Sequence, residues 1–264
     1  MDSIILSSPT RVLFSFGEVE IYVYGVCMAL AILFGTIVSN KFANVSNLFP
    51  KDIFISIIPW LVFSGLLGAR LWYCTLNWHE FSQNYLNILN FRSGGISIHG
   101  AILGGFIFLY FYSKLKKIPL INLCDYAVSG LALGQAIGRW GNFFNNEAFG
   151  LPTDGFLKLF IPYSSRPYQY QDYMYFHPTF LYESICDFIL FLLLFYLTVK
   201  KKLCSGMLTF LYLACYSLIR FFIELIRIDC EVKIFNLPFP AIVSLIVFTM
   251  ALGFIIFKLT KFNK

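Results

Sequence analysis

The sequence predicts an all-α polytopic membrane protein with about seven transmembrane helices. Hydrophobic residues make up 58% of the 264 residues, charged residues make up 13%, and the mean hydropathy is +0.72. Soluble domains carry about twice that share of charged residues. Aromatic residues, at 19%, fit lipid-facing helices with interfacial belts. The net charge of +6 requires no nucleic-acid partner, because the lysines lie in short clusters beside apolar runs.

Apolar stretches of membrane-spanning length recur along the chain. About 20 helical residues cross a hydrocarbon core of about 30 Å. We expect helices over residues 19–40, 53–76, 95–113, 119–140, 177–199, 206–227 and 238–257. Because no strong internal repeat is present, we interpret residues 1–264 as a single membrane-embedded domain. The seven cysteines form no CxxC pair, so neither a disulfide framework nor a metal site is indicated.

The lysines indicate how the chain is oriented in the membrane. All except Lys158 and Lys233 fall on one side of the predicted spans: Lys41, Lys51, Lys114, Lys116, Lys117, Lys200, Lys201, Lys202, Lys258, Lys261 and Lys264. By the positive-inside rule that side is cytoplasmic. We therefore expect the N-terminus outside, the C-terminus in the cytoplasm, and residues 141–176 as an extracytoplasmic loop region.

Several polar side chains are predicted at the opposite, outer level. They lie near the outer ends of five of the predicted helices: Arg70, His99, Arg139, His177, Arg220 and Arg227. Ionisable residues within membrane spans are costly and often functional. This convergence predicts a polar site at the level of the outer leaflet.

The stretch GQAIGRWGNFFNNEAFG, residues 134–150, contains the first group of candidate residues. Its glycines permit a close approach of a neighbouring helix or a ligand. Arg139 places a guanidinium group at the headgroup boundary. Among side chains, guanidinium has the best shape to bind a phosphate through two of its oxygens. Asn142, Asn145 and Glu147 are expected to follow as the chain leaves the helix. The alternative is an arginine that snorkels to the interface, followed by a polar exit loop.

The stretch YSLIRFFIELIR, residues 216–227, contains a second group. Tyr216, Arg220, Glu224 and Arg227 recur at spacings of four, four and three, which places them on one helix face. The alternative to a functional role is a structural one, in which an Arg220–Glu224 ion pair limits the cost of charge inside the membrane.

Two further stretches carry histidines. RSGGISIHGAILGG, residues 92–105, places His99 between glycines at a helix entrance. His99 is a plausible proton acceptor there, although a lone histidine is more often a structural, hydrogen-bonded group. HPTFLYES, residues 177–184, reads as a helix start. We expect its histidine, tyrosine and glutamate to be structural, with Glu183 a possible partner for an arginine.

Together, GRWGNFFNNEAFG, HPTFLYE, SGGISIHGAILGG and YSLIRFFIELIR resemble the signature blocks of the bacterial prolipoprotein diacylglyceryl transferase family. The resemblance extends from about Tyr24 to Arg227, and the order of the blocks and the seven-helix layout match too. Two departures affect local backbone geometry: Asn146 stands in place of a glycine often found before the glutamate, and Ser217 in place of a glycine after the tyrosine.

The resemblance implies transfer of the diacylglyceryl group of phosphatidylglycerol to the lipobox cysteine thiol of a prolipoprotein signal peptide, in the bacterial inner membrane and without a cofactor. The residues expected to act in catalysis are His99, Arg139, Glu147, Tyr216 and Arg220. Those expected to bind substrate are Tyr24, Asn142 and Glu224, together with Arg139, Glu147 and Arg220. The group that removes the thiol proton stays open between His99, Glu147 and a thiol whose pKa is lowered by the arginines.

Two other classes of membrane protein were weighed against an enzyme. A secondary transporter also carries charges in its helices, but repeat symmetry and broken half-helices near the midplane are typical of that class. Here the charges gather toward one face of the membrane. A structural scaffold does not require two arginine-bearing groups and a histidine. The sequence therefore favours a membrane-embedded transferase.

Overall fold

The computed structural model describes residues 3–17, 19–46, 48–82, 84–91, 94–200, 203–229 and 232–262. Predictions that involve Arg92, Ser93, Lys201, Lys202, Cys230 or Lys264 lie outside these residues.

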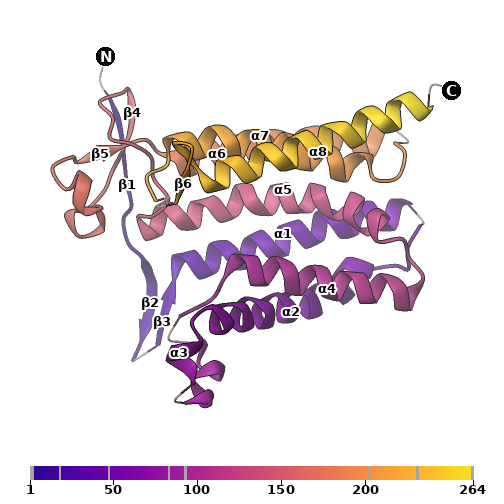
Figure 1. Ribbon diagram of the computed structural model, residues 1–264, viewed down its shortest axis with the longest axis horizontal. Coiled ribbons are helices and arrows are strands. Elements are labelled where there is room, and N and C mark those ends of the chain that lie inside the picture. Colours follow the sequence, from indigo (N-terminus) through magenta and orange to yellow (C-terminus); the bar gives the residue numbers. More distant parts are fainter. Residues whose placement is uncertain are drawn as a thin grey trace. The chain divides into compact units, whose positions relative to one another are not determined.

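Seven helices among the described residues are long and apolar enough to cross a membrane, so the chain is a multi-pass membrane protein. They are α1 (Val23–Ser46), α2 (Ile53–Leu76), α4 (Ile98–Lys116), α5 (Leu120–Asn145), α6 (Thr179–Lys200), α7 (Met207–Ile226) and α8 (Phe239–Phe262) (Figure 1). The predicted helical, polytopic class is confirmed. The outward N-terminus and cytoplasmic C-terminus stay predictions.

Several predicted helix boundaries differ from those of the structure. The first helix begins at Val23 rather than at residue 19, because residues 19–22 form a strand. The fourth spanning helix, α5, continues to Asn145, five residues past its predicted end. The fifth spanning helix, α6, begins at Thr179 rather than at residue 177, so His177 and Pro178 precede it. The extramembrane segment expected at residues 141–176 therefore starts after Asn145.

The chain divides into two compact units. The larger unit comprises Met1–Ser39 and Asp125–Lys264, and the smaller unit comprises Asn40–Cys124. The expectation of one membrane-embedded domain over residues 1–264 stays a prediction.

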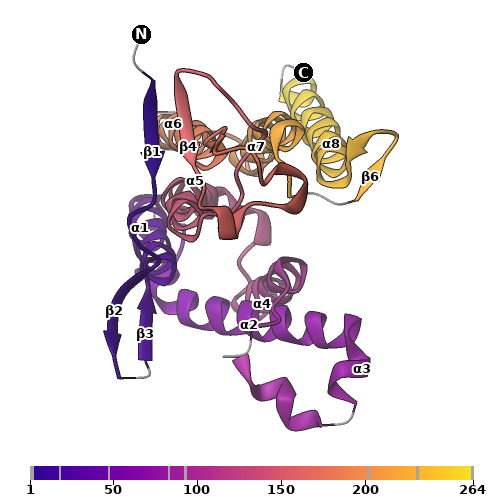
Figure 2. The ribbon, with the colours of Figure 1, turned by 90° about the vertical axis from the view of Figure 1, so that its left-hand side faces the viewer.

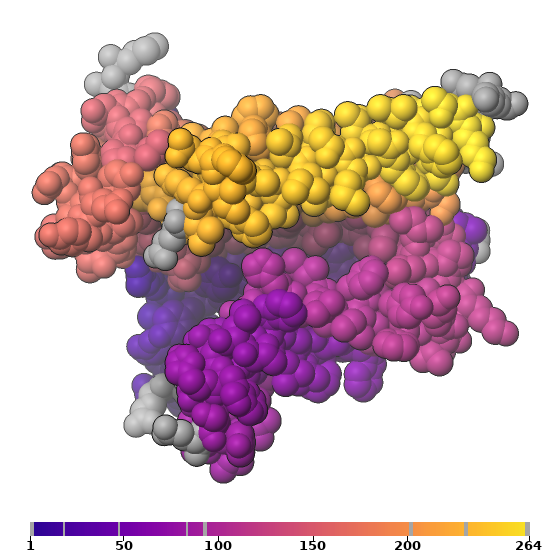
Figure 3. All heavy atoms as spheres, in the orientation of Figure 1, coloured from indigo at the N-terminus to yellow at the C-terminus, as the bar shows by residue number. Residues whose placement is uncertain are grey.

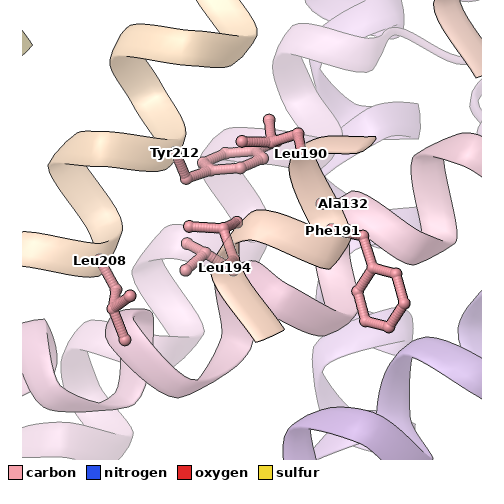
Figure 4. Close-up of a cluster of buried hydrophobic side chains, with 7 residues drawn as sticks. Ala132, Leu190, Phe191, Leu194, Leu208 and Tyr212 are labelled. Carbon is pink, nitrogen blue, oxygen red and sulfur yellow. The ribbon is translucent and has the colours of Figure 1, made fainter. Parts of the chain in front are cut away.

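In the larger unit, α5, α6 and α7 pack around a buried apolar cluster. Its members are Val128, Ala132, Leu190, Phe191, Leu194, Leu208 and Tyr212 (Figure 4). The α1 and α5 helices pack closely through glycines, since a Cβ added at Gly130 would meet the carbonyl oxygen of Gly35 at 2.1 Å. Small residues at such crossings are typical of membrane helices.

A buried aspartate fixes the start of α7. The side chain of Asp125 accepts hydrogen bonds from the backbone N–H groups of Gly206 and Thr209 at 2.6 and 2.9 Å, and from the Thr209 hydroxyl at 2.6 Å. A helix start leaves backbone donors without partners inside the helix, and a carboxylate is a favourable acceptor there. Asp125, on α5, thereby ties α7 to its neighbour.

Short strands outside the spans were absent from the prediction. β1 (Ile4–Ser7) pairs in parallel with β4 (Leu157–Phe160), which pairs antiparallel with β5 (Tyr175–Phe176) (Figures 1 and 2). β2 (Val12–Phe16) and β3 (Val19–Tyr22) form a hairpin, and β6 (Lys233–Ile234) pairs with β7 (Leu237–Pro238).

The segment that contains β4 and β5 forms a lobe at one end of α6, α7 and α8 (Figures 1 and 3). It also holds two short 3-10 helices, η3 (Tyr163–Ser165) and η4 (Tyr168–Tyr170). Its apolar centre is formed by Phe149, Leu159, Ile161, Phe176 and Phe180. Since Phe180 belongs to α6, this centre fixes the N-terminal end of that helix.

In the smaller unit, α2 and α4 are in close contact, and a buried arginine organises the chain between them. A Cβ added at Gly100 would meet the carbonyl oxygen of Gly68 at 2.3 Å. The connection contains α3 (Trp78–Phe81) and η1 (Tyr85–Leu89). Arg70, 2% exposed, donates hydrogen bonds to five backbone carbonyls of that connection, those of Asn87, Ile88, Asn90, Gly94 and Gly95. Arg70 thus has a structural role.

Candidate active site

Two arginines from different helices meet on one buried carboxylate. Arg139 Nη2 of α5 lies 2.6 Å from Glu183 Oε1 of α6. Arg220 Nη1 of α7 donates to both carboxylate oxygens of Glu183 at 3.0 Å. The Glu183 side chain is 2% exposed, whereas those of Arg139 and Arg220 are 21% and 17% exposed. The expectation that Glu183 is an arginine partner is therefore confirmed. Of the side chains predicted to converge, Arg139 and Arg220 lie together, and the convergence of the full set stays a prediction.

Aromatic packing between α5 and α6 brings Arg139 to Glu183. Phe143, one turn after Arg139, stacks on Phe180, which lies three residues before Glu183, at a centroid distance of 4.9 Å. The Ser184 hydroxyl, one turn after Phe180 on α6, donates to the carbonyl of Ala136 on α5 at 2.7 Å. The contact and the hydrogen bond together set the register of the two helices.

Two tyrosines of α7 set its register against α5. Tyr212 donates to Gln135 Oε1 at 2.8 Å and stacks on Tyr216 at 5.6 Å and 7°. Arg139 Nη2 in turn donates to the Tyr216 hydroxyl at 3.4 Å. Tyr216, a predicted site residue, therefore touches the arginine cluster directly.

The predicted ion pair within α7 is present as well. Arg220 Nη2 lies 2.5 Å from Glu224 Oε2, and the Glu224 side chain is 5% exposed. Arg220 is thus held between two carboxylates of different helices. With Arg139, the cluster pairs two guanidinium groups with Glu183 and Glu224, which limits the cost of placing charge in a membrane.

The end of α5 positions the remaining residues of the first predicted group. Asn146 has a positive φ of 53°; its N–H donates to Phe143, and that of Glu147 donates to Asn142. This is the Schellman arrangement, in which asparagine tolerates the left-handed position that glycine commonly takes. Asparagine at position 146, in place of the glycine often found in the family, therefore does not change the geometry of the turn. The Asn142 side chain, inside the helix, donates to Glu147 Oε1 at 2.9 Å.

Tyr24 reaches this end of α5 from the first turn of α1. Gly141 leaves room for its ring, because a Cβ there would lie 2.7 Å from a Tyr24 ring carbon. The hydroxyl of Tyr24 interacts electrostatically with both Arg139 and Glu147. Tyr24 therefore links the arginine cluster to the carboxylate at the helix end.

Known proteins resemble this chain over most of its length. A family described as "Prolipoprotein diacylglyceryl transferase" matches residues 11–257. Three relatives bear the name phosphatidylglycerol–prolipoprotein diacylglyceryl transferase. That of Parasynechococcus marenigrum is 42% identical over 84% of this chain and 82% of its own length. That of Trichormus variabilis is 41% identical over 94% of this chain and 89% of its own length. That of Synechococcus elongatus is 44% identical over 84% of this chain and 78% of its own length.

The chain belongs to the prolipoprotein diacylglyceryl transferase family. The match includes both units, and with them every residue that the sequence analysis singled out for the site. Which of these residues act in this transferase, and how, stays a prediction.

His99, the candidate base of this transferase, belongs to the smaller unit. It is the second residue of α4, and its side chain is exposed. The preceding Gly95 has a φ of +72° and packs against Arg70 and Tyr73, where a Cβ would lie within 2.7 Å of both side chains. The entrance to α4 is thus fixed by the buried arginine.

An arginine beyond the end of α7 has an acidic partner that the sequence analysis missed. Arg227 forms an ion pair and two hydrogen bonds with Asp229. Burial acts to raise the pKa of Asp229, but the hydrogen bonds and charge of Arg227 outweigh it and hold the pKa below its usual value. Burial likewise opposes the charge of Arg227, yet Asp229 raises its pKa. Arg227 also bridges to Gly150 through the backbone, which supports a structural role.

Asp187 was absent from the predicted site. It lies on α6 one turn after Glu183, is 0% exposed, and interacts electrostatically with Glu183, Arg139 and Arg220. Neither of its oxygens has a hydrogen-bond partner among the described residues. Its position four residues after Glu183 places the two carboxylates on the same face of α6, and this spacing could have identified it from the sequence. His177 contacts the Tyr182 hydroxyl at 3.3 Å, in keeping with the structural role expected of both.

Proposed function

We propose that the chain transfers the diacylglyceryl group of phosphatidylglycerol to the thiol of the lipobox cysteine of a prolipoprotein, in the bacterial inner membrane. A sulfur–carbon bond forms between the thiol and the glyceryl carbon, and the bond from that carbon to the phosphate oxygen breaks. The thiol proton ends on the released glycerol phosphate, which balances the reaction. Family membership and the names of the relatives support this proposal.

The observation that carries the proposal is the meeting of Arg139 and Arg220 on Glu183. Each guanidinium has five N–H donors, and each uses only part of this set in the bonds described above. Donors already in place near a leaving phosphate stabilise charge that develops in the transition state without a cost of reorganisation. We therefore assign the phosphate to these two side chains, with Tyr216 beside Arg139 and Glu224 holding Arg220.

The other predicted residues receive supporting roles. Asn142 and Glu147 form a hydrogen-bonded pair at the end of α5, and Tyr24 links that pair to Arg139. An amide, a carboxylate and a phenol suit the hydroxyls of a glycerol headgroup, which both donate and accept hydrogen bonds. We propose that they orient this headgroup.

Substitution of the arginines tests this assignment. Transfer to a lipobox peptide is measured with the purified full chain in nanodiscs that contain phosphatidylglycerol. Arg139→Ala and Arg220→Ala should each lower the rate by at least about a hundredfold, in the range seen on removal of a transition-state donor. Lysine should restore only part of it, because a point charge lacks the bidentate fork. Lys158→Ala, which removes a cation of the extramembrane lobe, is the matched control. Full activity in either alanine variant contradicts the phosphate assignment.

The proton step is assigned to His99. Its exposed position at the entrance of α4 leaves the ring accessible, and histidine is the side chain whose usual titration range lies nearest neutral pH. We propose that it accepts the thiol proton as sulfur attacks. Glu147, or a thiol ionised by the arginines, is the alternative.

The pH dependence of transfer separates these possibilities. With His99 as the base, His99→Gln removes the proton acceptor, so its pH profile should differ from that of the unmodified chain. His99→Gln should lose most activity at neutral pH and recover as the thiol ionises unaided, near its reference pKa of about 8.5. The measurement is the transfer rate of both proteins from roughly pH 6 to 9, which includes the reference pKa of the thiol. Parallel profiles for the two proteins contradict the base role.

A further inference from the structure

A polar pocket of the larger unit lies between the β2–β3 hairpin, the start of α1 and the end of α5. Its volume is about 480 Å³, within the range of about 300–1,000 Å³ typical of small-molecule sites. The residues that line it are Arg11, Tyr22, Tyr24, Gly25, Asn145 and Glu147. Arg11 and Tyr22 were absent from the predicted site.

The cation of the pocket is held in place but has unused donors. The carbonyl of Arg11 accepts a hydrogen bond from the N–H of Val23 at 2.9 Å, which fixes its backbone beside the start of α1. Its Nη2 donates to the Ser165 hydroxyl at 2.8 Å. Within the described part of the chain, no carboxylate forms an ion pair with Arg11. Its remaining donors are therefore available to an anion.

The other lining groups complement an anion that carries hydroxyls. The Tyr22 hydroxyl donates to Glu20 at 2.7 Å, and this hydrogen bond raises the pKa of Tyr22, so the phenol stays protonated at neutral pH. The Glu147 carboxylate and the oxygen of the Asn145 amide are hydrogen-bond acceptors among the residues that line the pocket. One guanidinium faced by such acceptors matches a phosphate attached to a small polyol better than a bare anion, which Glu147 would repel.

The pocket is connected to the arginine cluster through Tyr24. This side chain lines the pocket and interacts electrostatically with both Arg139 and Glu147. Tyr24 therefore places the pocket near the arginine to which we assign the phosphate.

We propose that this pocket binds glycerol phosphate, with Arg11 holding the phosphate and the Glu147 side accepting hydrogen bonds from the glycerol hydroxyls. The inference rests on the proposed function, which releases this monoester at the arginine cluster. The same chemistry is carried by the headgroup of a waiting phosphatidylglycerol molecule.

Direct binding tests the pocket without reference to turnover. The purified full chain in phosphatidylcholine nanodiscs is titrated with free glycerol phosphate, followed by calorimetry and by phosphorus NMR. Arg11→Gln should weaken binding by about tenfold, the loss expected for one charge-assisted hydrogen bond near solvent. Arg11→Lys should recover part of the affinity. Lys158→Gln, matched in charge and located in the lobe outside the pocket, should bind as the unmodified chain does.

A second arm distinguishes the two sources of the ligand. The same variants are compared in nanodiscs with increasing phosphatidylglycerol, with lipid contact at the pocket read from a spin label on the protein. Dependence on Arg11 for the free monoester supports the pocket as a product site, and dependence for the lipid alone supports it as a headgroup site. If neither ligand distinguishes Arg11→Gln from Lys158→Gln, the inference is wrong. Absence of transfer by the unmodified chain contradicts the proposed function instead.

Discussion

Replacement of Glu183 by glutamine tests whether one carboxylate assembles the two arginines. The variant keeps the shape of the side chain and removes its charge. Glu183 is 2% exposed and contacts Arg139 at 2.6 Å and Arg220 at 3.0 Å. Removal of one partner from a buried ion pair typically costs about 3–5 kcal/mol, because the other charge is left buried. Both arginines retain some solvent contact, so we expect the lower end, about 3 kcal/mol.

Asp187→Asn is the matched control, because it makes the same chemical change one turn along α6. Asp187 is also fully buried, yet neither of its oxygens has a hydrogen-bond partner among the described residues. A buried charge that lacks hydrogen bonds costs more free energy than a neutral amide in the same position. Asp187→Asn should therefore be as stable as the unmodified protein or more so, in contrast to Glu183→Gln.

The free energy of unfolding of the three proteins is compared by titration with denaturing detergent in mixed micelles, with helix content read by circular dichroism. The expected order of stability places Glu183→Gln last. If Asp187→Asn loses as much stability as Glu183→Gln, the assignment of Glu183 as the shared partner of the arginines is refuted, because burial alone then explains both losses.

Two further predictions concern segments outside the buried cluster. Asn146→Gly should retain or raise the midpoint temperature of thermal unfolding. The position has a φ of +53°, which glycine adopts without strain, and the side-chain oxygen of Asn146 has no hydrogen-bond partner in the described ranges. A fall of several degrees contradicts the helix end described above. For Asp229, the pKa in the folded state is lowered, so its ion pair with Arg227 stabilises above the reference carboxyl pKa of about 3.9 and the stabilisation disappears as pH falls through the folded pKa. The stability difference between the unmodified protein and Asp229→Asn should shrink accordingly from pH 7 to 3, and a constant difference contradicts the pairing.

The spanning helices could be predicted from sequence because each is determined locally. A helix satisfies its own backbone hydrogen bonds in lipid, so apolar length is nearly sufficient to identify it. The strands lacked such a signal. Ile4 pairs with Leu157, and nothing in either tetrapeptide specifies a partner so distant along the chain. The end of α5 was placed too early because polar residues were taken to mark the exit, whereas Asn142 and Asn145 lie within the helix.

The candidate site was predicted where spacing on one helix sufficed, and less fully where contacts join helices. Arg220 and Glu224 are four residues apart, so their pairing follows from helix geometry. The meeting of Arg139 with Glu183 depends instead on the register set by Phe143 and Phe180. Arg70 was grouped with the other outer arginines, although backbone carbonyls of the next connection surround it. Residue type and depth alone could not separate these two environments.

The contacts of Glu183 give it two opposed effects in the proposed reaction. It holds Arg139 and Arg220 together against their mutual repulsion, which prepares the donors before the lipid arrives. It also competes with the phosphate of that lipid for the same donors. A phosphodiester shares one negative charge in the ground state, whereas the leaving phosphate gains charge as its bond to carbon breaks. The cost of freeing these donors from Glu183 falls on substrate and transition state alike. The attraction of the arginines is greater in the transition state, where the phosphate carries more charge. This difference, rather than tight lipid binding, is what accelerates the reaction.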